Sequence, residues 1–155
     1  MLPTLKILFL CTGNSCRSQM AEAWTRKLFP QRFDVQSAGT HPGRLDPRAV
    51  RAMADVGIDI SGQRSKHVEE VAGTGFDYVI TVCDSARENC PVFPGRARRI
   101  HAGFDDPPHL AAGALTEEEA LAHYRRVRDE IRDYVAKLPD LAAAGEDDTA
   151  RGRPA

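Results

Sequence analysis

Residues 5–18 read LKILFLCTGNSCRS, and this stretch decides the fold. Residues 5–10 are mostly apolar and have the length of a strand. After the loop, large apolar side chains recur at helical spacing, at Met20, Trp24 and Leu28. Pro30 interrupts that pattern. We therefore expect a strand, a tight loop and a helix that begins at Arg17.

The loop has the properties of an oxyanion site. A loop at a helix N-terminus presents backbone N–H groups and the positive end of the helix dipole. Glycine and asparagine tolerate the left-handed backbone that such a cradle needs. An arginine adds a planar fork of donors that suits a tetrahedral anion. The predicted oxyanion-binding residues are Thr12, Gly13, Asn14, Ser15, Cys16 and Arg17.

Cys11 is the candidate nucleophile. A helix N-terminus and an arginine lower a cysteine pKa from about 8.5 to roughly 3.5–7.5, so we expect an activated thiolate at Cys11. The alternative is a buried structural cysteine. Packing alone, however, does not require a Cys and an Arg-Ser pair at this spacing between a strand and a helix.

The chain continues as an alternation of strands and helices. A second strand is predicted around residues 33–35, with a turn at Gly39, and strand–helix–strand units of this kind are parallel and right-handed. A helix then begins with Asp46 as its N-cap and ends at Gly57. Its predicted apolar face consists of Val50, Met53 and Ala54. We expect Ser65 to cap another short helix.

The strongest strand signal is the apolar run over residues 76–82, which is typical of a buried parallel strand. After it come a loop, an edge strand and a turn, predicted over residues 84–95, 97–101 and 103–108. Thr116 and Glu119 form a capping box that opens a long helix, and Pro139 ends it. The predicted apolar face of this helix is Leu121, Tyr124, Val127, Ile131, Val135 and Leu138.

Strands that alternate with helices predict an α/β fold. We expect a three-layer, doubly wound, four-stranded parallel sheet with helices on both faces. A chain of 155 residues is long enough for one core, and we assign residues 1–140 to a single domain. Residues 141–155 have little to bury, so we expect a disordered tail there.

Composition narrows the class of protein. The formal net charge is −1, which does not support nucleic-acid binding. No segment approaches the roughly 20 apolar residues of a membrane helix, and the first apolar run is too short for a signal peptide. We expect a cytoplasmic monomer whose four cysteines are reactive or metal-binding, not a disulfide framework.

Cys83 follows the strand over residues 76–82, so it lies at the same edge of the sheet as Cys11. Taken alone, Cys83 is better explained as the end of a buried strand. If residues 83–90 were helical, Cys83 and Cys90 would lie about 10 Å apart, whereas a disulfide needs Cα atoms within roughly 4.4–6.8 Å. A disulfide between them requires this segment to unwind, which suggests a thiol–disulfide relay. Zinc is the rival, but the cysteine and histidine spacings do not match zinc knuckles.

Four segments together resemble one protein family. They are CTGNSCRSQMAE at residues 11–22, SAG at 37–39, VCDSARENCP at 82–91 and GFDDP at 103–107. They resemble the thioredoxin-coupled arsenate reductases, which share the low-molecular-weight protein tyrosine phosphatase fold. The loop alone also resembles the phosphatases, whereas the three-cysteine arrangement is more specific. The resemblance covers nearly everything up to the long final helix.

The resemblance implies a role for each residue. Cys11 attacks arsenate held by the loop and Arg17, and Asp106 is the general acid that protonates the departing oxygen. Cys83 attacks Cys11 in the adduct, arsenite leaves, and a Cys11–Cys83 disulfide remains. Cys90 then attacks Cys83, and thioredoxin reduces the Cys83–Cys90 disulfide. No tightly bound cofactor is implied, and phosphate and sulfate are competing oxyanions.

Two further loop residues receive an interpretation. The resemblance implies that Ser18 hydrogen-bonds Cys11. Cys16 matches a loop cysteine outside the relay, and we interpret it as a packing residue or a site of oxidation. Because the loop is shared with phosphatases, a weak phosphatase side activity is also expected.

Some family members bind potassium beside the loop through an Asn, a Glu, a Ser and an Asp. Asn14, Glu22 and Ser37 match the first three, but Lys66 stands where we place the Asp. An ammonium group there would replace the cation and orient Asn14 and Glu22. We therefore expect activity that does not depend on potassium. The alternative is a solvated surface lysine.

Two other functions and the identity of the reductant remain open at this point. A tyrosine phosphatase would use the same loop and Asp106 but would leave Cys83 and Cys90 without a role. A non-catalytic redox or metal sensor would use those two cysteines but would leave Arg17 and Asp106 without one. Some related reductases use mycothiol or glutaredoxin as the reductant. The presence of both Cys83 and Cys90 favours thioredoxin without excluding these two.

Overall fold

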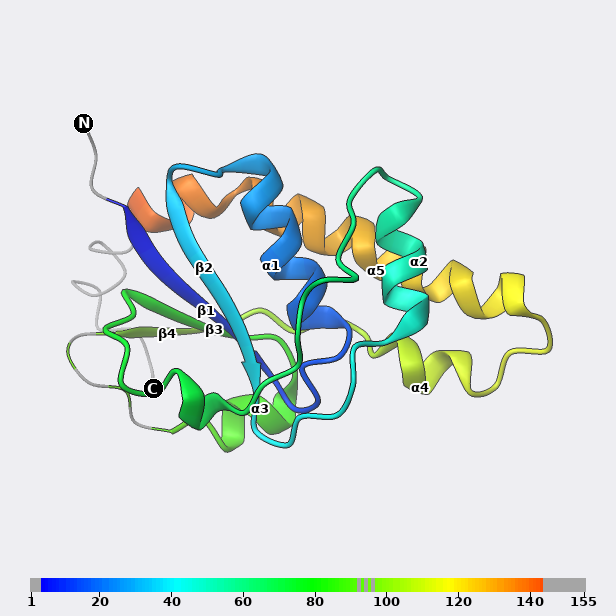
Figure 1. Cartoon of the computed structure of the whole chain (residues 1–155), viewed down its shortest axis with the longest axis horizontal. Helices are drawn as coiled ribbons and strands as arrows, with labels where there is room; N and C mark the ends of the chain where they lie inside the picture. Colours follow the sequence, from blue (N-terminus) through cyan, green and yellow to red (C-terminus); the bar gives the residue numbers. More distant parts are fainter. Residues whose placement is uncertain (1–3, 92, 94, 96, 144–155) are drawn as a thin grey trace.

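The computed structural model describes residues 4–91, 93, 95 and 97–143. Four parallel strands form one sheet in the order β2-β1-β3-β4 (Figure 1). They are β1 (Leu5–Cys11), β2 (Phe33–Gly39), β3 (Tyr78–Thr81) and β4 (Arg98–His101). The predicted α/β fold with a four-stranded parallel sheet is confirmed.

Helices cover both faces of the sheet. They are α1 (Arg17–Leu28), α2 (Pro47–Ala54), the short 3-10 helix η1 (Val68–Glu70), α3 (Asp84–Glu88), α4 (Pro107–Ala111) and α5 (Glu117–Ala136). The β1-to-β2 and β3-to-β4 connections run in opposite directions across the sheet, so right-handed crossovers place α1 and α3 on opposite faces. Figure 1 shows α1 beside α5, with α2 and α4 near the beginning of α5.

The predicted apolar face of α5 is confirmed, because all six of its residues are buried. In α1, Met20 and Trp24 are buried, but Leu28 is 38% exposed because it lies at the end of the helix. The predicted face of α2 was partly wrong. The buried side is formed by Ala49, Ala52 and Met53, while Ala54 faces solvent.

Several predicted boundaries were wrong. The predicted loop over residues 84–95 begins with α3, which is too short to show helical periodicity. The predicted turn at residues 103–108 leads into α4, where Asp106 is the N-cap and Pro107 the first helical residue. His67, not Ser65, caps η1. Half of the predicted capping box is formed, since Thr116 accepts from the N–H of Glu119 at 3.1 Å, while the Glu119 carboxylate accepts from the N–H of Leu115 at 2.9 Å and not from that of Thr116.

The packed chain extends beyond Pro139. Residues 138–143 are helical again, and Pro139 is tolerated because it lies in the first turn of this segment, where a backbone N–H has no helical partner. Ala142 packs against the core. The rest of the predicted tail, residues 144–155, lies outside the described residues. Among the helices that the structure describes, none is long and apolar enough to cross a membrane.

Candidate active site

The loop between β1 and α1 is held from its outer side. Backbone N–H groups of residues 40, 41, 43 and 46 donate to the carbonyls of residues 11, 12, 13 and 15 at 2.9–3.1 Å. The carbonyl of Asn14 accepts from the side chains of Gln19 and Ser65 at 2.8 and 2.5 Å. Because the C=O and N–H of a trans peptide point in opposite directions, the N–H groups of residues 12–16 face the inside of the loop. The loop, called the cradle here, therefore presents N–H donors that suit an oxyanion.

Asn14 is the loop residue with a left-handed backbone, at φ 49°. Its side-chain amide donates to the hydroxyl oxygens of Ser18 and Ser37 at 2.8 and 3.0 Å, and its amide oxygen accepts from the backbone N–H of Lys66 at 2.9 Å. Ser37 in turn donates to the buried carboxylate of Glu22 at 2.5 Å. This network fixes the unfavourable Asn14 conformation from three sides.

Gly39 allows the sheet to approach the loop closely. A Cβ atom at this position would lie 2.5 Å from the carbonyl oxygen of Thr12 and 3.0 Å from the Cβ of Asn14. Sequence reasoning assigned Gly39 only to a turn, whereas it is the last residue of β2 and pairs with Cys11. A glycine at the carboxyl end of a strand beside a glycine-containing loop was the available signal.

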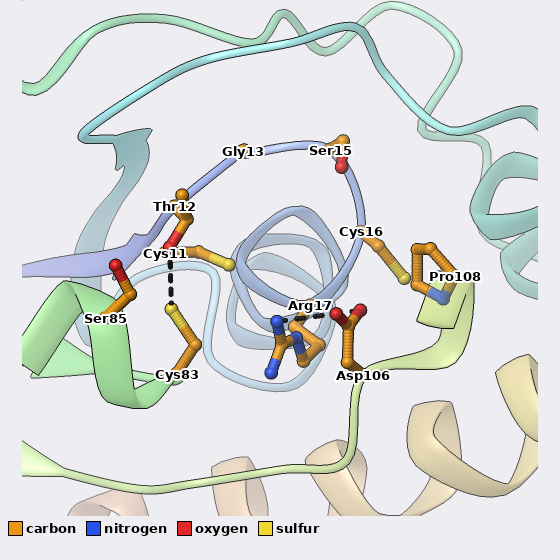
Figure 2. Close-up of a pocket in the computed structure, with 10 residues that line it drawn as sticks. All are labelled: Cys11, Thr12, Gly13, Ser15, Cys16, Arg17, Cys83, Ser85, Asp106 and Pro108. Atoms are coloured by element: carbon orange, nitrogen blue, oxygen red, sulfur yellow. Dashed lines mark hydrogen bonds and ion pairs between the residues drawn. The ribbon is translucent and has the colours of Figure 1, made fainter. Parts of the chain in front are cut away.

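The cradle opens into a cavity of about 430 Å³ (Figure 2). Arg17 lies at its base with a side chain only 12% exposed. One guanidinium nitrogen donates to the carbonyl of Phe104 at 2.9 Å, and the other lies 3.6 Å from a carboxylate oxygen of Asp106. Arg17 thus ties the loop to the segment that carries Asp106.

Asp106 lies across the cavity from the loop. It occupies the N-cap position of α4, but its side chain makes no capping hydrogen bond. The carboxylate is instead 47% exposed and faces Arg17 in Figure 2. Its position in the wall of the cavity suits a proton donor to a bound oxyanion.

Cys83 lies in the same cavity as Cys11, because β1 and β3 are neighbours in the sheet. The pKa values of Cys11 and Cys83 depend on one another, which places the two sulfurs close enough to interact. The Cys83 sulfur also lies 3.2 Å from the hydroxyl oxygen of Thr12 and accepts from the N–H of Ala86 at 3.4 Å. The topology thus brings together the two cysteines that the sequence placed at one edge of the sheet.

The two thiols share one negative charge, and the contact with Cys83 opposes the predicted lowering of the Cys11 pKa. The hydrogen bond from Cys11, helped by those from Thr12 and Ala86 and by the charge of Arg17, lowers the pKa of Cys83 to about 5. The same contact with Cys83, together with burial, raises the pKa of Cys11 despite the opposing effects of Arg17 and the N–H of Thr12. Two thiolates in contact would repel, so one sulfur keeps its proton.

The other two cysteines are also thiols, since none of the four forms a disulfide. Cys16 is 3% exposed, and burial raises its pKa. Cys90 follows α3 and is half-buried; burial raises its pKa, while the charge of Arg99 opposes this. Cys83 caps the beginning of α3 and Cys90 lies beyond its end, so the helix separates them.

Two predicted contacts take a different form. The hydroxyl of Ser18 accepts from Asn14, and within the described part of the chain it makes no hydrogen bond to Cys11, whose sulfur contacts Cys83 instead. Lys66 supports the loop through its backbone N–H. The guanidinium of Arg26, not the ammonium of Lys66, forms the direct ion pair with Glu22. Among the described residues, no three metal-ligating side chains gather in one place.

Comparison with known proteins identifies the family. A model of the low molecular weight phosphotyrosine protein phosphatases matches residues 6–147. The chain belongs to this family. Arsenate reductase of Bacillus subtilis (strain 168) is 46% identical over 140 residues, which are 90% of this chain and 96% of that protein. Arsenate reductase of Halalkalibacterium halodurans is 49% identical over 125 residues, 81% and 88% of the two chains.

A solved structure of an arsenate reductase in the phosphate-binding state has a TM-score of 0.70 and 31% identity, over 87% of this chain and 96% of that one. The phosphatase-family fold therefore extends over the cradle, Arg17 and Asp106. Cys83 adds a second thiol to the cavity that Cys11 lines.

Proposed function

We propose that this member of the low molecular weight phosphatase family is an arsenate reductase. Its proposed relay runs through Cys11, Cys83 and Cys90, and thioredoxin restores the thiols. The observation that carries the proposal is that Cys11 and Cys83 line one cavity together with the loop and Arg17. Phosphoester hydrolysis needs one nucleophile, whereas reduction of arsenate needs two electrons and therefore two thiols. The names of the relatives at 46% and 49% identity support the same activity.

The first step forms a bond between the sulfur of Cys11 and arsenic. Cys83 lies in the same cavity and takes the Cys11 proton, so Cys11 attacks as a thiolate. Arg17 and the inward N–H groups hold the equatorial oxygens. Asp106 protonates the departing oxygen, which leaves as water.

The second step transfers the electrons. Cys83 attacks the sulfur of Cys11, and its proton goes to an oxygen of the leaving group. The S–S bond forms as the S–As bond breaks with its electron pair on arsenic, so arsenate becomes arsenite while two thiols become a disulfide. Cys90 then displaces Cys11 from Cys83, and thioredoxin reduces the Cys83–Cys90 disulfide in the cytoplasm.

The test is arsenate-dependent NADPH oxidation with thioredoxin and thioredoxin reductase, beside hydrolysis of an aryl phosphate. Wild type is expected to oxidise NADPH in proportion to arsenate and to hydrolyse the aryl phosphate slowly. Cys11→Ser should abolish both reactions. Cys83→Ser should abolish only the reduction of arsenate, because hydrolysis uses the loop and Asp106. Efficient hydrolysis without NADPH oxidation would instead make the chain a phosphatase.

We also expect turnover that does not depend on potassium, for a reason other than the one the sequence suggested. Glu22 has a side chain only 6% exposed, and it pairs with the guanidinium of Arg26. Arg26 also donates to the carbonyl of Val35 at 3.0 Å. The carboxylate that a potassium ion would need is therefore already paired, and the residues present do not fit a metal ion.

Arg26→Gln should create a dependence on potassium. Because a half-exposed ion pair contributes up to about 1 kcal/mol, turnover in sodium buffer is expected to fall by up to about fivefold. Potassium at equal ionic strength should restore it. Lys27→Gln, at an exposed position of the same helix, is the control. A wild type that potassium accelerates over sodium would contradict this account.

A further inference from the structure

Asp46 joins three parts of the chain through three hydrogen bonds. Its backbone N–H donates to the carbonyl of Ser15 at 2.9 Å, on the outer side of the cradle. One of its carboxylate oxygens caps α2 by accepting from the N–H of Arg48 at 2.9 Å. The other accepts from the phenol hydroxyl of Tyr124, on α5, at 2.5 Å. Capping of α2 needs only the first of these oxygens, so the bond to Tyr124 calls for another explanation.

We propose that Tyr124 is a positioning residue of the oxyanion site, and that it acts through Asp46 on the last N–H donor of the cradle, that of Cys16. The inference rests on the oxyanion site of the proposed function, but not on the thiol relay. It gives a side chain of α5 a part in anion binding, although α5 supplies none of the described residues that line the cavity.

The path from Asp46 to the donor follows from the geometry of one peptide group. The carbonyl of Ser15 and the N–H of Cys16 belong to the same peptide, and in a trans peptide they point in opposite directions. A hydrogen bond that holds the carbonyl toward Asp46 therefore holds the N–H toward the inside of the cradle. Figure 2 shows Ser15 and Cys16 on the part of the loop that leads into α1. The position of Asp46 thus sets the direction of this donor.

Tyr124 is suited to hold Asp46 in place. Its side chain is 1% exposed and belongs to the buried face of α5. Burial and the hydrogen bond to Asp46 raise the pKa of Tyr124, so its hydroxyl remains a donor. A hydrogen bond to a carboxylate is about twice as strong as one between neutral groups. A ring fixed in the core therefore holds the carboxylate of Asp46 from the side opposite the cradle.

The alternative is that this hydrogen bond only attaches α2 to α5. The two helices have a second attachment that does not involve Asp46, because Arg48 donates to both carboxylate oxygens of Glu117 at 2.9 and 3.1 Å. Both side chains of that ion pair are exposed. Glu117→Gln therefore weakens the attachment of the helices without changing Asp46, whereas Tyr124→Phe removes the bond to Asp46.

Hydrogen exchange followed by NMR tests the connection in the protein without any anion. Tyr124→Phe removes one oxygen atom and leaves the ring in the core. Exchange of the Asp46 N–H is expected to become about tenfold faster, on the scale of one hydrogen bond to a charged group. Exchange of the Gly43 N–H, which donates to the carbonyl of Gly13 in the same loop, should not change. Equal acceleration at both positions, or none at Asp46, would overturn the proposal.

Calorimetric titration with inorganic phosphate tests the effect on the site. The dissociation constant of Tyr124→Phe is expected to rise about fivefold, on the scale of one hydrogen bond. Tyr78→Phe is the matched control, because this buried residue of β3 loses a phenol hydrogen bond to the carbonyl of Ala142 at 3.3 Å. Tyr78→Phe and Glu117→Gln should bind phosphate like wild type. Unchanged affinity in Tyr124→Phe, or an equal loss in either control, would overturn the proposal.

A double-mutant cycle tests whether Tyr124 acts through Asp46. Asp46→Ser keeps the backbone N–H and one side-chain oxygen that can cap α2, but it has no second oxygen for Tyr124. If the two residues act as a unit, adding Tyr124→Phe to Asp46→Ser should weaken phosphate binding no further. Fully additive losses would mean that Tyr124 acts on the site by another path, and would overturn the proposal.

The outcomes separate this inference from the proposed function. A wild-type protein that binds no phosphate would count against the oxyanion site of the proposed function. If wild type binds phosphate and Tyr124→Phe binds it equally well, only the inference fails. Absence of arsenate-dependent NADPH oxidation would count against the reductase alone, because neither hydrogen exchange nor phosphate binding involves a thiol reaction.

Discussion

Cys90→Ser is expected to release about one equivalent of arsenite and then to stop turning over with thioredoxin. Cys11 and Cys83 lie together in the cavity and suffice for one transfer of two electrons. The resulting disulfide would then lie at the 5–8%-exposed positions that these cysteines occupy, where a protein reductant has little access. Without Cys90, the disulfide stays between the two buried cysteines and no Cys83–Cys90 disulfide forms for thioredoxin to reduce. Arsenite released per enzyme in a rapid-quench experiment, beside steady-state NADPH oxidation, measures both halves of this prediction.

The structure of α3 suits the movement that the proposed relay requires. The helix has five residues, and the sulfur of Cys83 is its N-cap, accepting from the N–H of Ala86. A disulfide at Cys83 replaces a charged acceptor with a weak, neutral one, so the helix loses its cap when the relay needs it to unwind. Unwinding lets Cys90 come within disulfide distance of Cys83.

Asn89→Ser is the matched control, because it changes the exposed neighbour of Cys90 in the same segment and leaves all four thiols in place. It should turn over like wild type. If Cys90→Ser also turned over with thioredoxin at the wild-type rate, arsenate reduction by Cys11 and Cys83 would stand. Cys90 would then have no place in the mechanism.

The sequence predicted what depends on local pattern. The apolar run before Cys11 and the helical spacing after Arg17 define strand, loop and helix, and parallel strands bring their carboxyl ends to one edge. That is why Cys83 could be placed beside Cys11 without any contact information. Cys83 and Cys90 became interpretable as a pair through their spacing and their resemblance to known reductases.

What the sequence did not reveal depends on contacts between distant segments. The ion pair of Glu22 with Arg26 depends on which side chains of α1 face β2, whereas Lys66 looked suitable only because it follows Ser65. The sharing of one negative charge between Cys11 and Cys83 depends on the contact between them. A local argument treats the two thiols separately and assigns the thiolate to the one nearest the helix N-terminus.

The hydrogen bonds that hold the loop in place also depend on contacts between distant segments. Donors from residues 40, 41, 43 and 46 fix the carbonyls of residues 11, 12, 13 and 15, and no periodicity or motif predicts hydrogen bonds between irregular segments. Such a cradle is rigid because each carbonyl has a partner outside the site, which leaves the N–H groups available to an anion.

Gly39→Ala is expected to damage both folding and activity. The added Cβ would lie 2.5 Å from the Thr12 carbonyl oxygen, which is backbone and already accepts from the N–H of His41. Neither backbone segment can move without straining a hydrogen bond, because the N–H of Gly39 itself donates to the carbonyl of Lys66. Overpacking of this kind costs about 1–3 kcal/mol in the free energy of unfolding. Denaturant unfolding followed by tryptophan fluorescence measures that loss.

The effect on catalysis should be larger than the loss of stability suggests. Relief of the overlap moves the peptide after Thr12, whose carbonyl orients the next N–H of the cradle. A displacement of about 1 Å in a positioning group costs on the order of a hundredfold in rate. We therefore expect arsenate turnover and phosphate affinity to fall together in Gly39→Ala, even at temperatures where the variant is folded.

Gly62→Ala is the control for this prediction, because a Cβ there meets nothing within 4 Å and the backbone needs no left-handed conformation. It should match wild type in both unfolding free energy and turnover. A stable Gly39→Ala variant with normal phosphate affinity would show that the loop can move away from β2 without losing its shape. The hydrogen bonds of Asn14 alone would then fix the geometry of the cradle. Variants of Ser37, which takes part in that network, would test this explanation.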